Sequence, residues 1–364
     1  MDVVERFVRY AKVSSKSRNE KEFSLLIKDD LEKLGFEVFI DNAGEKVGGN
    51  TGNVFGRLKG NSDKKPLLFC AHMDTVEPCD GINPIIEDGI IKSDGTTILS
   101  ADCKSGIATI IEAIKEVIDS NEERGDIEVL FTICEEVGLL GAKFFDFNKV
   151  KAREAFTVDT GGDAGIITIK GPYHHIIEAE FIGKASHAGN APEKGISAIQ
   201  MAARAIDNMN LLKIDEETTA NIGTIEGGSA TNVVAESCKI KLEARSLSED
   251  KLKKQVDSML KAINEAANYF SGDVKINEYL EYPGFSLKED SPIKEMFAKA
   301  CENLSIDYFE KNSRGGADTH FFPESIEATT ISCGMSNVHS TEEFISVKNL
   351  IDTKNLIAEL IRLA

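Results

Sequence analysis

The segment Leu67-Leu68-Phe69-Cys70-Ala71-His72-Met73-Asp74 indicates the class of fold to which this chain belongs. Its uninterrupted apolar run is typical of a strand that is buried on both faces of a helix-covered sheet. Further β-rich segments occur at residues 53–58, 127–134 and 154–158, and a strong helical pattern lies between them at residues 105–118. This alternation predicts an α/β domain with a mixed central sheet and helices on both faces.

The N-terminal part contains a start signal and a stop signal for one helix. Ser17 and Glu20 have the spacing of a capping box, in which each side chain bonds the backbone of the other. An amphipathic run from Phe23 to Leu34 follows, and Gly35 favours the left-handed conformation that ends a helix. We therefore predict a helix that begins at this capping box and stops at Gly35.

From Tyr173 the pattern changes to that of a second domain. The order of elements is β-α-β-β-α-β, which is typical of the ferredoxin-like arrangement. The six elements are predicted at residues 173–182, 195–209, 220–225, 233–245, 247–270 and 273–280. The α/β pattern then returns at residues 292–303, 329–333 and 348–363. We expect an inserted domain of residues 172–281 and a catalytic domain of residues 1–171 and 282–364.

The composition excludes several classes of protein. With 42 basic and 61 acidic residues in 364, the net charge is −19, which repels nucleic acid and anionic lipid. No apolar run approaches the ~18 to 20 residues of a membrane-spanning helix. The N-terminus lacks the pattern of a signal peptide, and the seven cysteines form no C-x-x-C pair. We expect a cytoplasmic protein with no nucleic-acid or membrane partner.

The central strand ends in two polar residues that face the same way. His72 and Asp74 are two positions apart, so they lie on one side of an extended chain. A metal-binding histidine needs a partner for its second ring nitrogen, and a carboxylate at this spacing can supply it. A strand-end histidine followed by a helix-capping aspartate has the same sequence. This pair alone leaves both interpretations open.

Three further carboxylates occur at junctions between elements. Asp102 precedes a helix, where it is either an ordinary N-cap or a ligand whose two oxygens bridge two metal ions ~3.5 to 4 Å apart. Glu135 and Glu136 end an apolar strand, and two buried neighbouring carboxylates repel each other unless a cation lies beside them. Because adjacent residues point in different directions, one glutamate can bind metal while the other acts as general base.

Two more residues complete a candidate ligand set. Asp159 ends an apolar segment before a Thr-Gly-Gly turn, and an ordinary turn aspartate has the same pattern. His339 stands in a polar loop, where a lone histidine usually has no role. Three other histidines are interpreted as structural: His174, His175 and His320. The candidate ligands for two zinc ions, with cobalt or manganese as substitutes, are His72, Asp102, Glu136, Asp159 and His339, with Asp102 shared.

Six groups of motifs occur in order along nearly the whole chain. They are His72-Met73-Asp74-Thr75-Val76, Asp94-Gly95-Thr96-Thr97 with Asp102-Cys103-Lys104-Ser105-Gly106, Glu135-Glu136-Val137-Gly138, Ser186-His187-Ala188-Gly189, Arg314-Gly315-Gly316-Ala317-Asp318 and Val338-His339-Ser340. In this order they resemble the peptidase T family of tripeptide aminopeptidases. More widely, the chain resembles the clan of co-catalytic zinc exopeptidases that includes aminoacylases and glutamate carboxypeptidases.

The resemblance assigns a role to each candidate of the catalytic domain. It implies one zinc held by His72, Asp102 and Asp159. It implies a second zinc held by Asp102, Glu136 and His339. Glu135 would be the general base, and Asp74 the carboxylate that orients His72. The implied enzyme therefore carries two zinc ions per subunit.

The resemblance also implies roles for the inserted domain and for one loop. The insert is similar to the family's lid, in which His187 would help to polarise the scissile carbonyl. Asn232 and Arg245 would hold the far end of the substrate, and Arg314 would be another substrate-binding residue. In several members of the family this domain mediates dimerisation, so the resemblance implies a homodimer through residues 172–281.

The implied activity is release of the N-terminal residue from short peptides, principally tripeptides, by a water activated between two zinc ions. Aminoacylases, dipeptidases and carboxypeptidases share the metal site, so they stay open as alternatives, as does a non-catalytic peptide-binding descendant. The chain departs from the family pattern at two places. Cys103 follows Asp102 where an acidic residue is usual, and residues 317–320 read Ala-Asp-Thr-His rather than Thr-Asp-Gly. We interpret Cys103 as an inert thiol.

Overall fold

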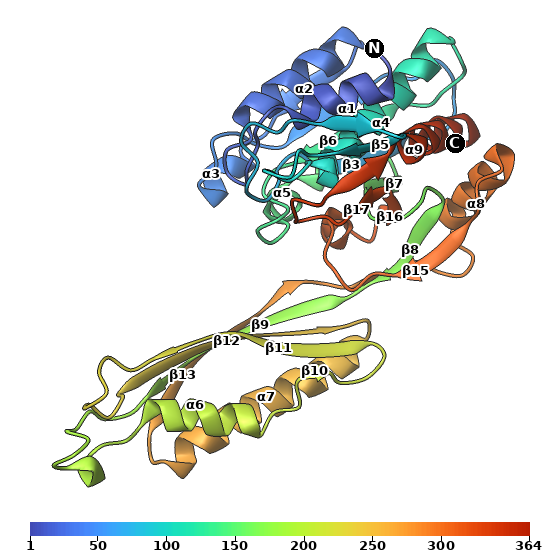
Figure 1. The fold of residues 1–364 in the computed structure, drawn as a ribbon. Coiled ribbons are helices and arrows are strands. Elements are labelled where there is room, and N and C mark those ends of the chain that lie inside the picture. Colours follow the sequence, from blue (N-terminus) through green and yellow to red (C-terminus); the bar gives the residue numbers. More distant parts are fainter. The chain divides into compact units, whose positions relative to one another are not determined.

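The computed structural model describes all 364 residues, and they divide into two compact units. Unit 1 comprises Met1–Ile169 and Ser286–Ala364, and unit 2 comprises Lys170–Phe285 (Figure 1). Among the helices, no single one combines the length and the apolar character that crossing a bilayer requires. The second unit is thus an insertion between two parts of the first.

The main sheet has nine strands in the order β1-β2-β6-β3-β7-β16-β8-β14, with β15 beside β8. Its centre is parallel and consists of β6 (Ile127–Thr132), β3 (Leu67–His72), β7 (Glu154–Thr160) and β16 (Glu327–Ser332). Every residue of β3 and β6 is buried, which explains why both strands are mostly apolar; the buried Glu128 of β6 pairs with Arg57. The flanking strands are β1 (Glu37–Ile40), β2 (Val54–Leu58), β8 (Ile166–Gly171), β14 (Phe285–Ser286) and β15 (Phe309–Asn312).

The two faces of this sheet are covered by different elements. Leu67, Phe69 and Ala71 of β3 pack into the larger core, whereas Leu68 and Cys70 belong to a smaller core on the opposite face. The larger core contains residues of α1 (Val3–Ala11), α2 (Lys21–Lys33), α4 (Ala101–Asp119), α8 (Pro292–Leu304) and α9 (Val347–Leu363). Short elements lie beside the smaller core: α5 (Leu140–Phe144), η1 (Phe147–Lys149) and η3 (Asp318–Phe321). The predicted α/β class with a mixed sheet is confirmed.

A small sheet carries one of the loops of interest. Its strand order is β17-β18-β5-β4, formed by β17 (Met335–Ser336), β18 (Phe344–Ser346), β5 (Ile90–Lys92) and β4 (Ile85–Glu87). The chain between β17 and β18 contains His339. A short helix, α3 (Ala43–Val47), lies elsewhere in unit 1.

Unit 2 is a single antiparallel sheet with two helices on one face (Figure 1). The strand order is β10-β11-β12-β9-β13, and the helices α6 and α7 share their apolar core with β9 and β12. The elements are β9 (Tyr173–Ile182), η2 (Pro192–Lys194), α6 (Ala198–Asp207), β10 (Leu212–Lys213), β11 (Thr218–Gly227), β12 (Ser237–Ser246), α7 (Glu249–Tyr269) and β13 (Asp273–Tyr282). The predicted β-α-β-β-α-β order is confirmed, with β10 as an added edge strand.

The predicted capping box is wrong, although the helix after it forms. Helix α2 begins at Lys21, its N-cap is Glu20, and no side chain caps it. The Ser17 hydroxyl instead donates a hydrogen bond to Asp74 Oδ2 at 2.7 Å, and Glu20 Oε1 accepts from the N–H of Cys134 at 3.1 Å. Both side chains therefore bind partners far along the chain. Gly35 ends the helix as predicted, with a φ of +90°.

Candidate metal centre

Five candidate ligands lie together where the parallel strands of the sheet end. His72 is the last residue of β3, and Asp159 is near the end of β7. Glu136 follows β6, the strand adjacent to β3. Because parallel strands end at the same edge of a sheet, local sequence places these three side chains near one another. Asp102 enters from the start of α4 and His339 from the loop between β17 and β18.

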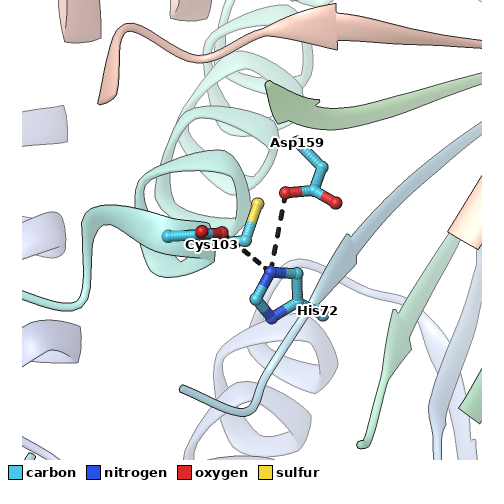
Figure 2. A group of neighbouring side chains, drawn as sticks. His72, Cys103 and Asp159 are labelled. Carbon is cyan, nitrogen blue, oxygen red and sulfur yellow. Dashed lines mark hydrogen bonds and ion pairs between the residues drawn. The ribbon is translucent and has the colours of Figure 1, made fainter. Parts of the chain in front are cut away.

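The first group of donors surrounds the ring of His72. Its Nε2 lies 2.9 Å from Asp102 Oδ1 and 3.5 Å from Asp159 Oδ1. Figure 2 shows the Asp159 carboxylate and the Cys103 thiol beside this ring. One donor atom from each of these four residues lies within 4.8 Å of the others. A cation of ordinary size therefore has nitrogen, oxygen and sulfur donors within reach of one point.

The second group meets at His339. Its Nε2 lies 2.9 Å from Glu136 Oε2 and 3.3 Å from Asp102 Oδ2. Asp102 thus presents Oδ1 to His72 and Oδ2 to His339. One carboxylate belongs to both groups and directs a different oxygen to each, which is the arrangement of a bridging ligand.

Burial makes the negative charges of this cluster costly. Desolvation raises the pKa of Glu136 and Asp159, and raises that of Glu135 well above its ordinary value. Hydrogen bonds to Asp102 and Glu136 raise the pKa of His339 to about 10. These carboxylates resist ionisation, and the neighbouring imidazole binds a proton strongly. Both effects indicate that the cluster stabilises positive charge. A divalent cation supplies such charge.

The Nδ1 side of the His72 ring faces Asp74. Its Nδ1 lies 2.9 Å from the backbone carbonyl oxygen of Asp74, whereas the Asp74 carboxylate is 3.6 Å away. That contact suits an Nδ1–H donor and leaves Nε2 to face the other candidate ligands. The orienting role of the Asp74 carboxylate stays a prediction, and the main chain of the same residue makes the shorter contact with the ring.

The Asp74 carboxylate holds the turn that carries the two glutamates. It accepts hydrogen bonds from the N–H groups of Glu135 at 2.9 Å and Glu136 at 3.2 Å. The Ser17 hydroxyl donates a third hydrogen bond at 2.7 Å. Asp74 is fully buried, so these donors replace its water. The backbone of the proposed base is thereby fixed.

Cys103 is buried beside Asp102, and its thiol donates a hydrogen bond to the carbonyl oxygen of Val158 at 2.8 Å. Desolvation raises the pKa of this thiol well above its ordinary value. A neutral, hydrogen-bonded thiol is consistent with the interpretation of Cys103 as inert. At this departure from the family pattern, the first group of donors therefore includes a thiol that is already hydrogen-bonded to the main chain.

Two buried acids near the site were not singled out by sequence reasoning. Glu343 accepts three backbone hydrogen bonds, and desolvation raises its pKa to about 7. Asp318 accepts a hydrogen bond from the Thr132 hydroxyl, and desolvation raises its pKa to about 7 as well. Asp318 stands inside a motif quoted for another residue, whereas Glu343 lies three residues beyond the last quoted motif. The hydrogen-bond partners of both acids are more than 180 residues away along the chain, so a local sequence pattern could not reveal that Glu343 and Asp318 lie near the site.

The candidate substrate-binding residues lie in both units. In unit 2, His187 Nδ1 accepts from the N–H of Gly189 at 3.1 Å, and the carbonyl of Asn232 accepts from the N–H of Ala188 at 2.9 Å. His187 and Asn232 are therefore on adjacent segments. Arg245 lies on β12. In unit 1, Arg314 is exposed in the loop before η3.

The histidines interpreted as structural in unit 2 pair with glutamates on neighbouring strands. His174 Nε2 lies 2.9 Å from Glu243 Oε2. His175 pairs with Glu278. His320, in unit 1, is buried within η3. None of these three histidines belongs to a group of side chains that could hold a metal ion.

Comparison with known proteins agrees with this geometry. The structure of aminopeptidase PepT from Bacillus cereus is 37% identical, covers 99% of this chain and 97% of its own, and superimposes with a TM-score of 0.92. A tripeptidase from Staphylococcus aureus is 31% identical with the same coverage and a TM-score of 0.95. The chain belongs to the peptidase T family of M20 peptidases. A further relative of this chain is the uncharacterised protein YqjE of Bacillus subtilis. The two are 36% identical over 360 residues, which cover 99% of this chain and 97% of YqjE.

Family models match both units of this peptidase. The peptidase dimerisation domain matches residues 175–270, which lie within unit 2. The model of peptidase family M28 matches residues 53–190, which include four of the five candidate ligands. The resemblance stated from the motifs is confirmed, and the chain is a peptidase. A dinuclear metal-binding M20 peptidase from Bacillus subtilis is only 16% identical, with a TM-score of 0.74, and shows likeness of fold alone.

Proposed function

We propose that this peptidase is a metal-dependent aminopeptidase that releases the first residue of short peptides, principally tripeptides. The observation that carries the proposal is the position of Asp102, whose two oxygens face His72 and His339 separately. Two similar structures, those of an aminopeptidase and a tripeptidase, support cleavage at the N-terminal end and the short length of the substrate. Both relatives cover nearly the whole chain.

The residues present fit a pair of divalent cations. His72, Asp102 and Asp159 would hold one ion. Asp102, Glu136 and His339 would hold the other. Imidazole and carboxylate donors suit two zinc ions per subunit, with cobalt or manganese as substitutes. The raised pKa values of the buried Glu136 and Asp159 support this fit, because a cation favours their ionised forms.

When bound, the cations supply Lewis-acid activation of the attacking water and of the peptide carbonyl. Glu135 then has the role of general base: it takes a proton from the water and passes it to the leaving amine. Burial raises the pKa of Glu135 above its ordinary value, which is the direction that favours uptake of a proton by this carboxylate. The hydrogen bond from its N–H to Asp74 keeps its backbone in place while this happens.

His187 is proposed to donate a hydrogen bond to the scissile carbonyl. Its Nδ1 accepts from the N–H groups of Gly189 and Asn190, each at 3.1 Å, so the neutral ring carries its proton on Nε2. That N–H is the donor that a carbonyl oxygen requires. The tautomer is thus selected by the protein before substrate binds.

The far end of a short peptide carries a carboxylate, for which arginine is the most suitable partner. We propose that Asn232, Arg245 and Arg314 bind this end. Arg314 is exposed, and a Cβ added at Gly315 would meet nothing nearer than Ser313 Oγ at 4.0 Å. Packing within the chain therefore does not require a glycine there, which is consistent with space kept for substrate.

Unit 2 is proposed to act as a lid and as the surface of a homodimer, with residues 172–281 as its bounds. The match to the dimerisation domain supports this assignment. Sedimentation equilibrium of the full chain tests it, with a mass of about 79 kDa expected from twice the 39.7 kDa of one chain. A cytoplasmic location is also proposed, since all seven cysteines are free thiols.

The experiment that tests the activity uses an unblocked tripeptide of three different residues. Zinc- or cobalt-loaded protein is incubated with it, in parallel with chelator-treated protein, and the products are identified by mass spectrometry. Release of the first residue, abolished by chelator, is the expected result. Release of the last residue would make the protein a carboxypeptidase. With no cleavage, N-acyl amino acids and dipeptides would be tested for the aminoacylase and dipeptidase alternatives before a non-catalytic role is accepted.

A further inference from the structure

Two loops in unit 1 place a candidate ligand through a backbone conformation that L-residues rarely adopt. Ser100, two residues before Asp102, has a φ of +67°, and His339 itself has a φ of +62°. Neither is glycine, so neighbouring contacts must hold each conformation. The side chain of His339 is also 51% exposed, so packing around it is not sufficient to position it.

The Glu343 carboxylate connects these two loops. It is 1% exposed and lies four residues after His339 on the same loop. Its Oε2 accepts hydrogen bonds from the N–H groups of Leu99 at 2.7 Å and Ser100 at 2.8 Å. Its Oε1 accepts from the N–H of Asp102 at 2.9 Å. One side chain from the His339 loop therefore accepts hydrogen bonds from three backbone N–H groups within residues 99–102, one of them that of the bridging aspartate.

A second contact joins the segment before Asp102 to the His339 loop, and it involves Ser93 and Thr341. The Ser93 hydroxyl is 2.7 Å from the carbonyl oxygen of Thr97 and 3.2 Å from that of Thr341. It bonds neither Asp102 nor His339. The hydrogen bonds of Glu343, by contrast, include one to the backbone N–H of a candidate ligand, Asp102.

We propose that Glu343 is a positioning residue that sets the placement of Asp102 relative to His339, and thereby the affinity for the cation that both would bind. The inference rests on the proposed metal-dependent function. It goes beyond it by naming a residue that touches neither cation nor substrate. Both oxygens are required as acceptors, so the amide of glutamine cannot replace the carboxylate: its NH2 group would face N–H donors.

The test compares Glu343→Gln with Glu342→Gln in the full chain. Glu342 is the adjacent, exposed glutamate, so its substitution removes the same charge one residue away. Zinc is titrated into metal-free protein by calorimetry, and bound zinc is counted by mass spectrometry of the metal. We expect Glu343→Gln to bind the second zinc at least tenfold more weakly, with a smaller effect on the first, and Glu342→Gln to match the parent.

Hydrogen exchange of the metal-free proteins supplies a second measurement. The amides of residues 99–102 are expected to exchange at least tenfold faster in Glu343→Gln than in the parent, while Glu342→Gln leaves them unchanged. A general loss of stability would instead accelerate exchange across the sheet, including β3 and β6. Local acceleration together with weaker zinc binding supports positioning.

If folded Glu343→Gln bound zinc as tightly as the parent, the inference about Glu343 would be overturned, while the proposed function would stand. A parent that binds fewer than two zinc ions would overturn the proposed function, and this inference with it, so the two failures are distinct. If Glu343→Gln does not fold, Glu343→Asp is used in both assays. Aspartate keeps the charge but is one methylene shorter, so it cannot reach all three donors, and unchanged zinc binding in it would again overturn the inference.

Discussion

The hydroxyl of Ser17 donates a hydrogen bond of 2.7 Å to the buried carboxylate of Asp74. The same carboxylate accepts the backbone N–H groups of Glu135 and Glu136. The N-terminal segment is fixed there by a further contact, from the Ser15 hydroxyl to the carbonyl oxygen of Met73 at 2.8 Å. A residue 118 positions away from Glu135 therefore helps to hold the turn of the proposed base.

We predict that Ser17→Ala lowers kcat/KM about tenfold with little change in melting temperature. A hydrogen bond to a charged group contributes about 1.5 kcal/mol, which corresponds to roughly tenfold in rate when the lost bond holds a catalytic group. The control is Ser291→Ala, because Ser291 is a true N-cap of α8. That variant should lower the melting temperature and keep the activity. If Ser17→Ala behaved like the control, Ser17 would act on stability rather than on the site.

Glu135→Gln should lose activity by about 10²- to 10⁴-fold, which is the usual contribution of a general base. Zinc content should stay at the parental value, because Glu135 is outside both proposed ligand sets, although one of its donor atoms lies within 4.8 Å of donors of His72 and Glu136. The matched variant is Glu136→Gln, which is expected to lose one zinc. Hydrolysis of a tripeptide and metal analysis on the same samples separate the two roles. A Glu135→Gln enzyme within tenfold of the parent would show that another group moves the proton.

His339→Ala should reduce bound zinc from two ions per chain to one. His339 Nε2 is near Glu136 and Asp102 only, so its loss leaves the group around His72 complete. The control is His187→Ala, whose residue belongs to none of the donor groups and should keep both ions. Metal analysis after dialysis against a fixed free zinc concentration measures the difference. Two ions bound by His339→Ala would remove this histidine from the ligand set.

The stability of unit 2 should depend on pH through Glu243. Hydrogen bonds from His174 and Arg245 lower the pKa of Glu243 to about 2, below its ordinary value of 4.5. Because the pKa of Glu243 is lower in the folded state than in the unfolded state, its ionised carboxylate stabilises the folded state at pH values above about 4.5. This stabilisation disappears as the pH falls from about 4.5 to about 2. Because the carboxylate is partly exposed, its contribution is on the order of 1–2 kcal/mol.

Glu243→Gln should therefore melt below the parent at pH 7 and approach it near pH 2. Circular dichroism melts at a series of pH values measure the difference between the two proteins. The exposed Glu193→Gln serves as control and should follow the parent throughout. A constant difference between Glu243→Gln and the parent across this range would mean that the ion pairs of Glu243 contribute nothing.

The success and failure of the sequence predictions have a common cause. The strands around His72 and Asp159, and the β-α-β-β-α-β order of unit 2, follow from periodicity within short segments. The capping box at Ser17 and Glu20 failed because both side chains found tertiary partners. The spacing of a capping box does not reveal whether a competing acceptor lies nearby in the fold.

The sequence alone determined the α/β class, the insertion and the types of residue at the strand ends, because apolar runs and junction carboxylates are local properties. Only the tertiary structure decided that Asp102 presents one oxygen to His72 and the other to His339. It also decided that Glu343 binds the N–H of Asp102 from 241 residues away. Contacts of this kind depend on how loops meet in space, and no periodicity along the chain encodes which donor will face which acceptor.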